Sequence, residues 1–528
     1  MKRLLFIALL AIGLGLLSEL PYYFMAKTVP AGTVYMGSIG NNYDQASYLS
    51  WMKEGQEGKL LFEELYTTEK QSGLFFNPFF LVCGQFARFT GLDLIVAYHL
   101  LRLFLVLALV FTLYLFSGMF LAGFWERFFS VTLASLGSGL GFLFSDGTLS
   151  YLSKSFNLVA LDLWVPETAI FSSILHKPLF LAALLLMLLS FYFQLKAFKS
   201  LNKYAVYASG FFGLLLALVH PYDLASVYGA LFVFLVWSKS GLKSWICFAG
   251  FFALSAPGLL YQYLLSHFDQ VFRSWAGTVT ISGTFYSYLI GYGIFFLLAG
   301  VYAWKTRGKR KEPEVFLLSW VLSHFLLAYL PLRFERRLVL GLMIPLVLLS
   351  VLWFFRYAVP YLKMKKVPVL AAGLTLCALA IPSNLRFVAG ELENARKYPF
   401  NYALPSADLA ALKWMDKNIP KGSTVFAFFP TGVYIPGLSG LKVYAGHYDQ
   451  TVNAESKRAD SGKFYEKNAS LSFRKYLLAK SRAGYVYYGT FEGSIGPFQK
   501  LPVPAEVIYD TGNVKILRLN PAASRSSN

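Results

Sequence analysis

The chain has 528 residues, of which 56% are hydrophobic and 14% charged, and its mean hydropathy is +0.51. This composition excludes a water-soluble globular protein of the same length. The formal net charge of +20 collects largely in loops between apolar segments, so it does not predict a nucleic-acid partner. The three cysteines lie in or beside apolar segments, which excludes a disulfide framework and a thiolate metal site.

The N-terminal segment begins with a basic pair and continues as an apolar stretch over residues 4–25. It contains no small-x-small cleavage motif, so we expect a retained first membrane span and not a signal peptide. A span needs about 20 apolar residues to cross the hydrocarbon core. Further stretches of this kind are predicted at residues 96–120, 126–145, 178–195, 242–265, 284–304, 315–330, 338–356 and 367–383.

Residues 205–238 are too long for one ordinary span, and His220-Pro221 at their middle would break a helix. One broken helix and two short helices are both compatible with the hydropathy. Lysine and arginine collect on cytoplasmic loops. Of the two interpretations, only the one with two short helices places the basic run at residues 305–311 on the cytoplasmic side. The sequence therefore predicts about eleven spans, with the N-terminus in the cytoplasm and the C-terminus outside.

This topology places most of the candidate polar residues on the outer face of the membrane. The first outer loop, residues 26–95, carries Asp44 and is too long for a connector, so we expect it to be functional. The later outer loops and span ends carry Glu167, His176, His220, Asp223 and a loop with three arginines, Arg333, Arg336 and Arg337.

Each of these residues also has a structural interpretation. Asp44 could be the N-cap of a helix, and Glu167 could open one. His176 and His220 each stand beside a proline at a span end, where a hydrogen-bonded interfacial histidine explains them as well as a ligand does. Asp223 lies near the top of a short apolar helix, where an unpaired charge is costly. The arginines could bind phospholipid headgroups.

Acids and arginines together on an outer membrane face suit one reaction, the attack on a sugar attached to a lipid phosphate. Guanidinium groups stabilise the anionic leaving phosphate. A carboxylate must take the proton of the acceptor hydroxyl, because an unactivated hydroxyl is a poor nucleophile. An acid in the first outer loop and the arginines of a later outer loop meet both demands.

Two short motifs stand in the first two outer loops: Tyr43-Asp44-x3-Tyr48, and Glu167 ahead of Phe171-Ser172-Ser173-x2-His176-x-Pro178. Together with the multi-span body and an outward C-terminal domain, they resemble the GT-C superfamily of integral-membrane glycosyltransferases, including its bacterial envelope members. Many members have two adjacent acids in the first loop, whereas this chain has Tyr43-Asp44-Gln45. This departure bears on the identity of the base and on metal dependence.

The resemblance implies a polyprenyl-phosphate sugar as donor and an envelope glycan, lipid or protein as acceptor. Asp44 would be the general base of an inverting displacement, and Glu167 would orient the acceptor. No cofactor is certain, although both acids could hold a divalent metal. Arg333, Arg336 and Arg337 would bind the donor phosphate. Possible substrate contacts are Tyr48, His176, His220, Asp223 and His447.

The chain changes composition near residue 384. Residues 1–384 are predicted to form the transmembrane catalytic domain, and residues 385–528 a small extracytoplasmic α/β domain. Its segment from Gly446 to Thr451 suits a sugar-contacting loop, although His447 there could also be an ordinary turn residue.

The sequence thus predicts a polytopic α-helical protein of the plasma membrane that acts as a hexosyl- or pentosyltransferase. One alternative is a lipid-linked sugar flippase or transporter, whose acids should lie at mid-membrane. The other is a non-catalytic membrane protein of envelope assembly.

Overall fold

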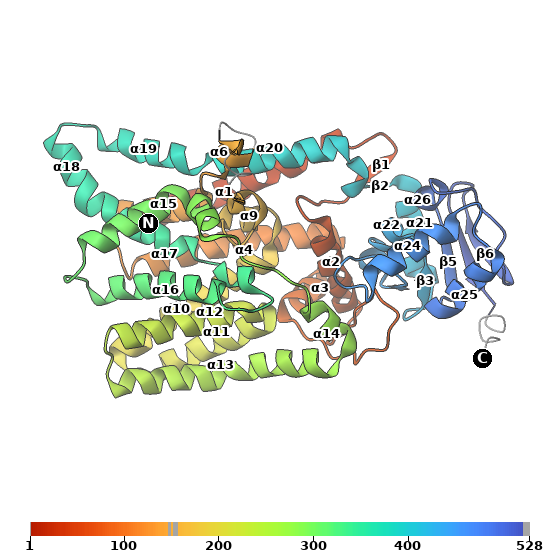
Figure 1. The fold of residues 1–528 in the computed structure, drawn as a ribbon, viewed down its shortest axis with the longest axis horizontal. Coiled ribbons are helices and arrows are strands. Elements are labelled where there is room, and N and C mark those ends of the chain that lie inside the picture. The colour runs from red at the N-terminus through yellow and green to blue at the C-terminus, as the bar shows by residue number, and fades with distance from the viewer. Residues whose placement is uncertain (1, 146–148, 152–156, 521–528) are drawn as a thin grey trace. The chain divides into compact units, whose positions relative to one another are not determined.

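The computed structural model describes residues 2–145, 149–151 and 157–520 (Figure 1). The chain divides into two compact units. The first, called the helical unit, consists of Met1–Pro21, Leu100–Gln262 and Val279–Glu393. The second, called the mixed unit, consists of Tyr22–His99, Tyr263–Thr278 and Asn394–Asn528.

Apolar helices dominate the structure, as the composition predicted. Eight helical segments of the described chain are long and apolar enough to cross a membrane, so this is a multi-pass membrane protein. These segments are Lys2–Thr28 (α1), Leu94–Ser117 (α4), Phe124–Ser145 (α5 and α6), Pro178–Ser200 (α10), Leu242–Phe268 (α13), Phe285–Lys305 (α15), Glu335–Met364 (α17 and α18 with their flanking turns) and Val369–Lys397 (α19 and α20).

The ambiguous stretch at residues 205–238 consists of two helices. Helix α11 covers Lys203–Val219 and α12 covers Pro221–Trp237, with His220 in an extended conformation between them. Pro221 is the first residue of α12, where its missing N–H costs nothing. This confirms the two-helix interpretation, while the total of about eleven spans stays a prediction.

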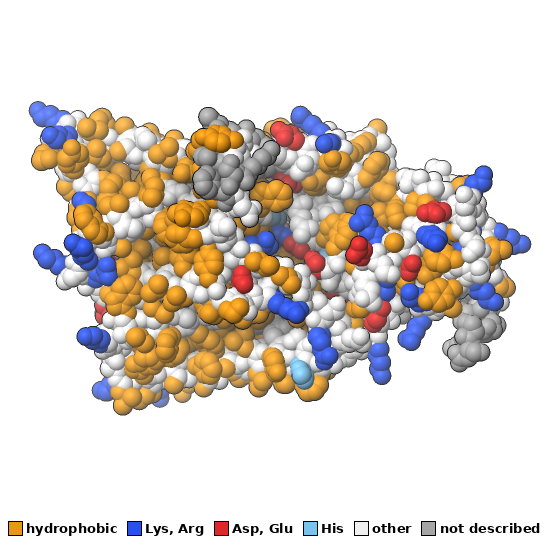
Figure 2. Space-filling view, in the orientation of Figure 1, with side chains coloured by type: hydrophobic (Ala, Val, Ile, Leu, Met, Phe, Trp, Pro, Cys, Tyr) orange, Lys and Arg blue, Asp and Glu red, His pale blue; other side chains and the backbone are white. Residues whose placement is uncertain are grey.

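Basic side chains gather at one end of the helical unit. The connections α12–α13, α15–α16 (Glu312–Ala328) and α18–α19 lie at the left end of this unit in Figure 1. Figure 2 shows Lys and Arg along this end and a largely apolar surface over the helices beside it. Such clustering is what the positive-inside rule expects of a cytoplasmic face.

Two apolar helices are interrupted where their backbones meet. Helix α5 (Phe124–Leu136) ends before a glycine-rich turn, α6 (Gly141–Ser145) follows it, and α15 has a non-helical residue at Gly293 with φ 48°. The Leu140 N–H donates to the carbonyl of Ile290 at 2.8 Å. A Cβ on Gly139 would lie 2.2 Å from that carbonyl, so only glycine permits this approach. Non-helical backbone inside a membrane protein must be buried in protein in this way.

The mixed unit joins the first loop to the C-terminal tail. Strand β1 (Thr33–Tyr35) pairs antiparallel with β2 (Ala403–Pro405). A five-stranded sheet has the order β4-β3-β5-β7-β6, with β3 parallel to β4 and β5, and β7 antiparallel to its two neighbours. The strands are β3 (Thr424–Phe426), β4 (Lys442–Val443), β5 (Tyr485–Tyr488), β6 (Ala505–Asp510) and β7 (Lys515–Leu519). This confirms the small α/β domain.

Helices α2 (Asn42–Gln56) and α3 (Pro78–Thr90) come from the first loop, and α14 covers Gln270–Ala276. The tail adds α21 (Ser406–Asn418), α22 (Phe429–Gly432), α23 (Ile435–Ser439), α24 (Ala454–Tyr465), α25 (Leu471–Ser481) and α26 (Thr490–Gly493). One hydrophobic cluster contains Met36 and Tyr66 of the loop together with Leu412 and Val425 of the tail. Loop and tail therefore share a core, while the domain boundary near residue 384 stays a prediction.

Candidate active site

Asp44 lies in the first turn of α2, in the mixed unit. The N-cap of this helix is Asn41, whose side chain accepts a hydrogen bond from the Tyr43 N–H at 3.1 Å. The N-cap interpretation of Asp44 is therefore wrong, and its half-buried carboxylate has the position that the helix dipole favours. Tyr48 lies one turn later, buried, with its ring 5.2 Å from that of Phe80, so it packs α2 against α3.

The loop of residues 446–451, called the clamp loop, is held against α2 and the first-loop chain. The Thr451 hydroxyl donates to the carbonyl of Tyr66 at 2.8 Å and accepts from the N–H groups of Gly446 and His447. The Ser47 hydroxyl of α2 donates to the Gln450 side chain at 2.8 Å. These bonds pre-organise the loop beside the helix that carries Asp44.

His447 is the centre of the clamp loop. Its Nδ1 accepts hydrogen bonds from the N–H groups of Asp449 and Gln450, both at 3.1 Å. Nδ1 is therefore unprotonated, and the neutral ring carries its proton on Nε2. Burial lowers the pKa of His447, although the charges of Asp44 and Asp449 oppose this. The ring lies 5.7 Å from Tyr43, whose neighbour is Asp44, so His447 belongs to the surroundings of this acid.

The arginine loop lies in the helical unit and is ordered by the chain before α15. The Thr280 N–H donates to the Arg333 carbonyl at 2.7 Å, and the Arg336 N–H donates to the Thr280 carbonyl at 3.1 Å. The Glu335 carboxylate accepts from the Ser282 N–H at 3.0 Å. The loop is therefore built on backbone pairing, which leaves the guanidinium groups available for other contacts.

The three arginines have different environments. Arg333 is exposed, whereas Arg336 and Arg337 are half-buried. The Arg337 guanidinium stacks on the ring of Tyr222 at 4.8 Å, and Tyr222 packs on Phe334 at 4.9 Å. Arg336 has a buried Nε that finds no hydrogen-bond partner within the described chain. Among the three, Arg336 is thus the arginine with a buried nitrogen that lacks a partner in the described chain.

The remaining predicted residues of the helical unit have protein partners. The Nδ1 of His220 and a carboxylate oxygen of Asp223 are 2.8 Å apart, and both side chains are buried. His176, the last residue of α9 (Ile170–His176), stacks on Phe387 at 5.6 Å and is buried. The pair His220–Asp223 explains how a carboxylate is tolerated in an apolar helix.

Glu167 lies in the turn between α8 (Leu161–Trp164) and α9, so it does not open a helix. Its side chain is only 6% exposed, and its Oε2 has no hydrogen-bond partner among the described residues. The charges of Arg336, Glu167 and Glu335 all act on the Tyr288 hydroxyl, which also hydrogen-bonds to Ser282 at 3.0 Å. Glu167 and Arg336 are therefore both near enough to Tyr288 for their charges to act on its hydroxyl.

Sequence reasoning missed three groups that the structure places near candidate residues. Tyr288 was hidden in an apolar span, where nothing distinguishes it from a lipid-facing tyrosine. Arg102 is fully buried, pairs with Glu19 and donates to the carbonyl of Ile174 in α9 at 2.8 Å. As a charge inside an apolar span it could have been recognised. The guanidinium of Arg458, in the tail, stacks on two aromatic rings, and no local sequence motif predicts this contact.

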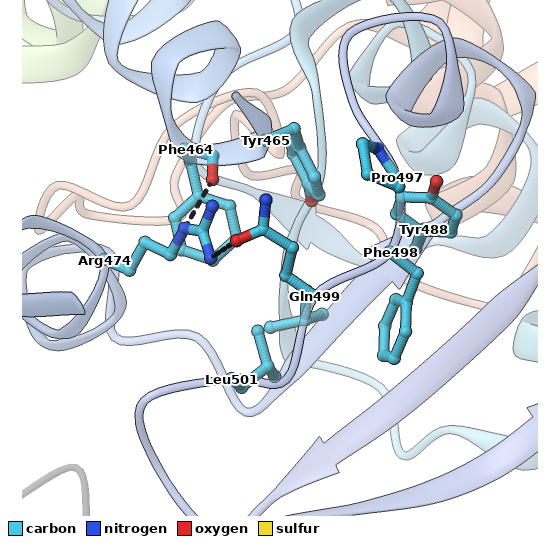
Figure 3. Close-up of a pocket in the computed structure, with 9 residues that line it drawn as sticks. Phe464, Tyr465, Arg474, Tyr488, Pro497, Phe498, Gln499 and Leu501 are labelled. Atoms are coloured by element: carbon cyan, nitrogen blue, oxygen red, sulfur yellow. Dashed lines mark hydrogen bonds between the residues drawn. The ribbon is translucent and has the colours of Figure 1, made fainter. Parts of the chain in front are cut away.

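A small cavity in the mixed unit is a different kind of feature (Figure 3). It is lined by Tyr465, Tyr488, Phe498 and others, and Arg474 closes one wall by donating to the Gln499 side chain at 2.6 Å. Its volume of about 20 Å³ accommodates a water molecule and not a sugar ring. We do not assign it to the substrate.

No protein-family model and no curated protein matches the chain. Solved structures do. The apo oligosaccharyltransferase of the archaeon Archaeoglobus fulgidus aligns with 91% of this chain and 70% of its own, at 12% identity and a TM-score of 0.50. The fold is a GT-C fold.

Other GT-C structures align less closely. The arabinofuranosyltransferase from Mycobacteria covers 96% of this chain and 40% of its own length, at 16% identity and a TM-score of 0.46. The archaeal enzyme in complex with Zn and sulfate aligns with 90% of this chain and 67% of its own, at 13% identity and a TM-score of 0.47. At these identities the GT-C likeness establishes the fold, and the function must be argued from the residues.

Proposed function

We propose that this protein is a membrane glycosyltransferase that moves a sugar from a polyprenyl-phosphate donor to a glycan, lipid or protein acceptor on the outer face of the plasma membrane. The observation that carries the proposal is that the charges of Glu167 and Arg336 both act on Tyr288, and that each side chain has a buried polar atom without a partner in the described chain. A buried carboxylate oxygen and a guanidinium nitrogen without protein partners are costly unless a substrate uses them. An anionic sugar phosphate with hydroxyl groups offers partners to both.

The chemistry assigns a role to each group. The acceptor oxygen attacks the anomeric carbon while its proton passes to the Asp44 carboxylate. The bond from the anomeric carbon to the phosphate oxygen breaks, and polyprenyl phosphate leaves with the electron pair. Arg336, assisted by Arg337 and the exposed Arg333, stabilises the negative charge of the leaving phosphate. A single displacement of this kind inverts the anomeric configuration.

Glu167 is proposed to orient the acceptor, and a divalent cation is a further proposal. No three His, Cys, Asp or Glu side chains form a metal-binding group in residues 2–145, 149–151 and 157–520. The free Oε2 of Glu167 fits a cation that completes its coordination with substrate phosphate and water, as Mg²⁺ does. Restored activity with Mg²⁺ or Mn²⁺ after chelation, lost in Glu167→Gln, would support this role.

We also propose the orientation in the membrane. The basic end of the helical unit would face the cytoplasm together with the N-terminus, and the tail would lie outside. The archaeal neighbour has been determined with an acceptor peptide and with dolichol-phosphate. A lipid-phosphate donor is proposed for this chain by the same chemistry, and its sugar would be a hexose or a pentose.

Lipid binding by the purified protein in nanodiscs tests the phosphate site. Undecaprenyl phosphate should bind at least about tenfold more tightly than undecaprenol, because only the phosphate engages the arginines. Arg336→Gln should remove this preference, whereas Arg307→Gln, which removes the same charge from an exposed position outside the proposed phosphate site, should change it less than threefold. Equal loss in both variants would mean non-specific attraction and would reject the assignment of Arg336.

Transfer is then measured with a panel of radiolabelled polyprenyl-phosphate sugars and membrane extracts as acceptors. Asp44→Asn should abolish product formation without lowering donor affinity. An active Asp44→Asn variant would remove Asp44 from the mechanism. Movement of the labelled lipid across liposomes without sugar transfer would instead favour the transporter alternative.

A further inference from the structure

We propose that the mixed unit contains a second anion site, in which Arg458 binds the negative charge of an acidic glycan acceptor beside Asp44. This inference rests on the proposed function and names the class of acceptor. The site consists of Arg458, Tyr448, Phe429 and Tyr43, all in the mixed unit, and is called the aromatic platform.

The platform is built from four elements, of which α2 belongs to the first loop and the other three to the tail. The Tyr448 ring of the clamp loop lies 4.8 Å from Tyr43 of α2 and 4.9 Å from Phe429 of α22. The Arg458 guanidinium of α24 lies over both Tyr448, at 5.2 Å, and Phe429, at 5.8 Å. Tyr448 remains 44% exposed, so its surface is open to a ligand.

Stacking leaves the hydrogen-bonding edge of Arg458 unused. A guanidinium on an aromatic face engages its flat surface, while its N–H groups point outward in the plane. Arg458 is exposed and forms an ion pair with no carboxylate of the described chain. A planar fork of this kind matches a carboxylate or phosphate bidentately.

The position of Arg458 is fixed by its neighbours and not by chance surface packing. The preceding residue, Lys457, is buried and pairs with Glu69 at 2.6 Å. The clamp loop that presents Tyr448 is closed by His447 and Thr451. A guanidinium stacked on two rings, on a helix held by the buried Lys457, should lose less conformational entropy on binding than an arginine without such contacts.

The platform lies on the acceptor side of the proposed reaction. Tyr43 precedes Asp44 on α2, and the charge of Arg458 acts on the Tyr43 hydroxyl. A sugar ring can place its C–H face on Tyr448 while its acidic group reaches Arg458, which brings neighbouring hydroxyls toward the proposed base. An acceptor glycan that carries uronic acids or phosphate has this combination of groups.

A matched pair of probes tests the site: a short cello-oligosaccharide and its C6-oxidised glucuronate counterpart, titrated into the nanodisc-embedded protein at 150 mM salt. The wild type should bind the glucuronate oligomer at least about tenfold more tightly than the neutral one. Arg458→Gln should remove this preference, and Arg458→Lys should retain part of it because the charge remains without the fork. Arg518→Gln, which removes an exposed arginine from β7, is the matched control and should leave it unchanged.

Three results would overturn the inference: equal binding of both oligomers, an equal loss in Arg518→Gln, or a loss of undecaprenyl phosphate binding in Arg458→Gln with glucuronate binding intact. The last result would assign Arg458 to the donor phosphate. The assay needs neither donor nor turnover. Weak glucuronate binding by a chain that transfers sugar therefore rejects only this inference, and selective binding without transfer rejects only the proposed function.

Discussion

His447 offers a direct test of how the clamp loop is held beside Asp44. Two substitutions separate the role of the ring nitrogen Nδ1 from that of Nε2. Asn places an acceptor oxygen where Nδ1 stands, so His447→Asn retains bonds to the N–H groups of Asp449 and Gln450. Gln reaches the position of Nε2 instead, so His447→Gln loses both bonds and leaves the two N–H groups without their acceptor.

The magnitude follows from those two bonds. Each hydrogen bond contributes about 1 kcal/mol, so His447→Gln should lower the free energy of local opening by about 2 kcal/mol. Exchange of amide hydrogens in residues 446–453 would then accelerate about 30-fold. His447→Asn should change it less than about fivefold. Hydrogen exchange with mass spectrometry measures both variants without a substrate.

The pH dependence of the stability of the clamp loop is a second test of His447. Its pKa is lowered in the folded protein, so the unfolded chain binds more protons below the ordinary histidine value of about 6.5. The bonds to Nδ1 therefore stabilise the loop fully above this pH and progressively less as the pH falls. His447→Asn should abolish this pH dependence. Equal exchange in the Asn and Gln variants, or no acid effect in the wild type, would refute the proposed tautomer and its role.

Two further predictions concern stability. Burial raises the pKa of Glu492 to about 7, so its folded form holds a proton that the unfolded chain releases above about pH 4.5. Relative to Glu492→Gln, the melting temperature of the wild type should fall as the pH rises from about 4.5 to about 7, and melting temperatures that change in parallel in the two proteins would contradict this sign. Gly139→Ala should destabilise the protein by more than about 2 kcal/mol, because its Cβ meets the Ile290 carbonyl. Gly300→Ala in α15, which meets nothing within 4 Å, should be neutral or stabilising in the same thermal assay.

Local patterns predicted much of the membrane-embedded part of the fold. The break at His220-Pro221 followed from a proline rule, and the small α/β region of the tail followed from the change of composition near residue 384. The predicted span at residues 126–145 matches the segment Phe124–Ser145, but the interruption after α5 ends at Leu136 was not predicted. Hydropathy cannot detect this interruption, because the glycines that permit the close backbone crossing are themselves compatible with an apolar helix.

For the candidate residues, too, the sequence predicted some features and only the structure showed others. The sequence identified Glu167 and the arginine loop by their charges on a predicted outward face, but it did not tell which of the three arginines reaches the phosphate. The structure distinguishes them, because the backbone pairing of the loop and the ring of Tyr222 direct each guanidinium to a different environment. Sequence patterns could not predict the aromatic platform, since its four residues come from four separate elements of the first loop and the tail.

The sequence by itself determined that this is a multi-pass membrane protein, that its chain breaks at His220-Pro221, and which acids and arginines are expected in its loops. These properties follow from transfer free energies and backbone sterics, which act residue by residue. Only the tertiary structure decided that the first loop and the C-terminal tail share one core, and that His447 and Arg458 stand in the surroundings of Asp44. Such contacts join segments some 400 residues apart, and their formation depends on packing that no local propensity encodes.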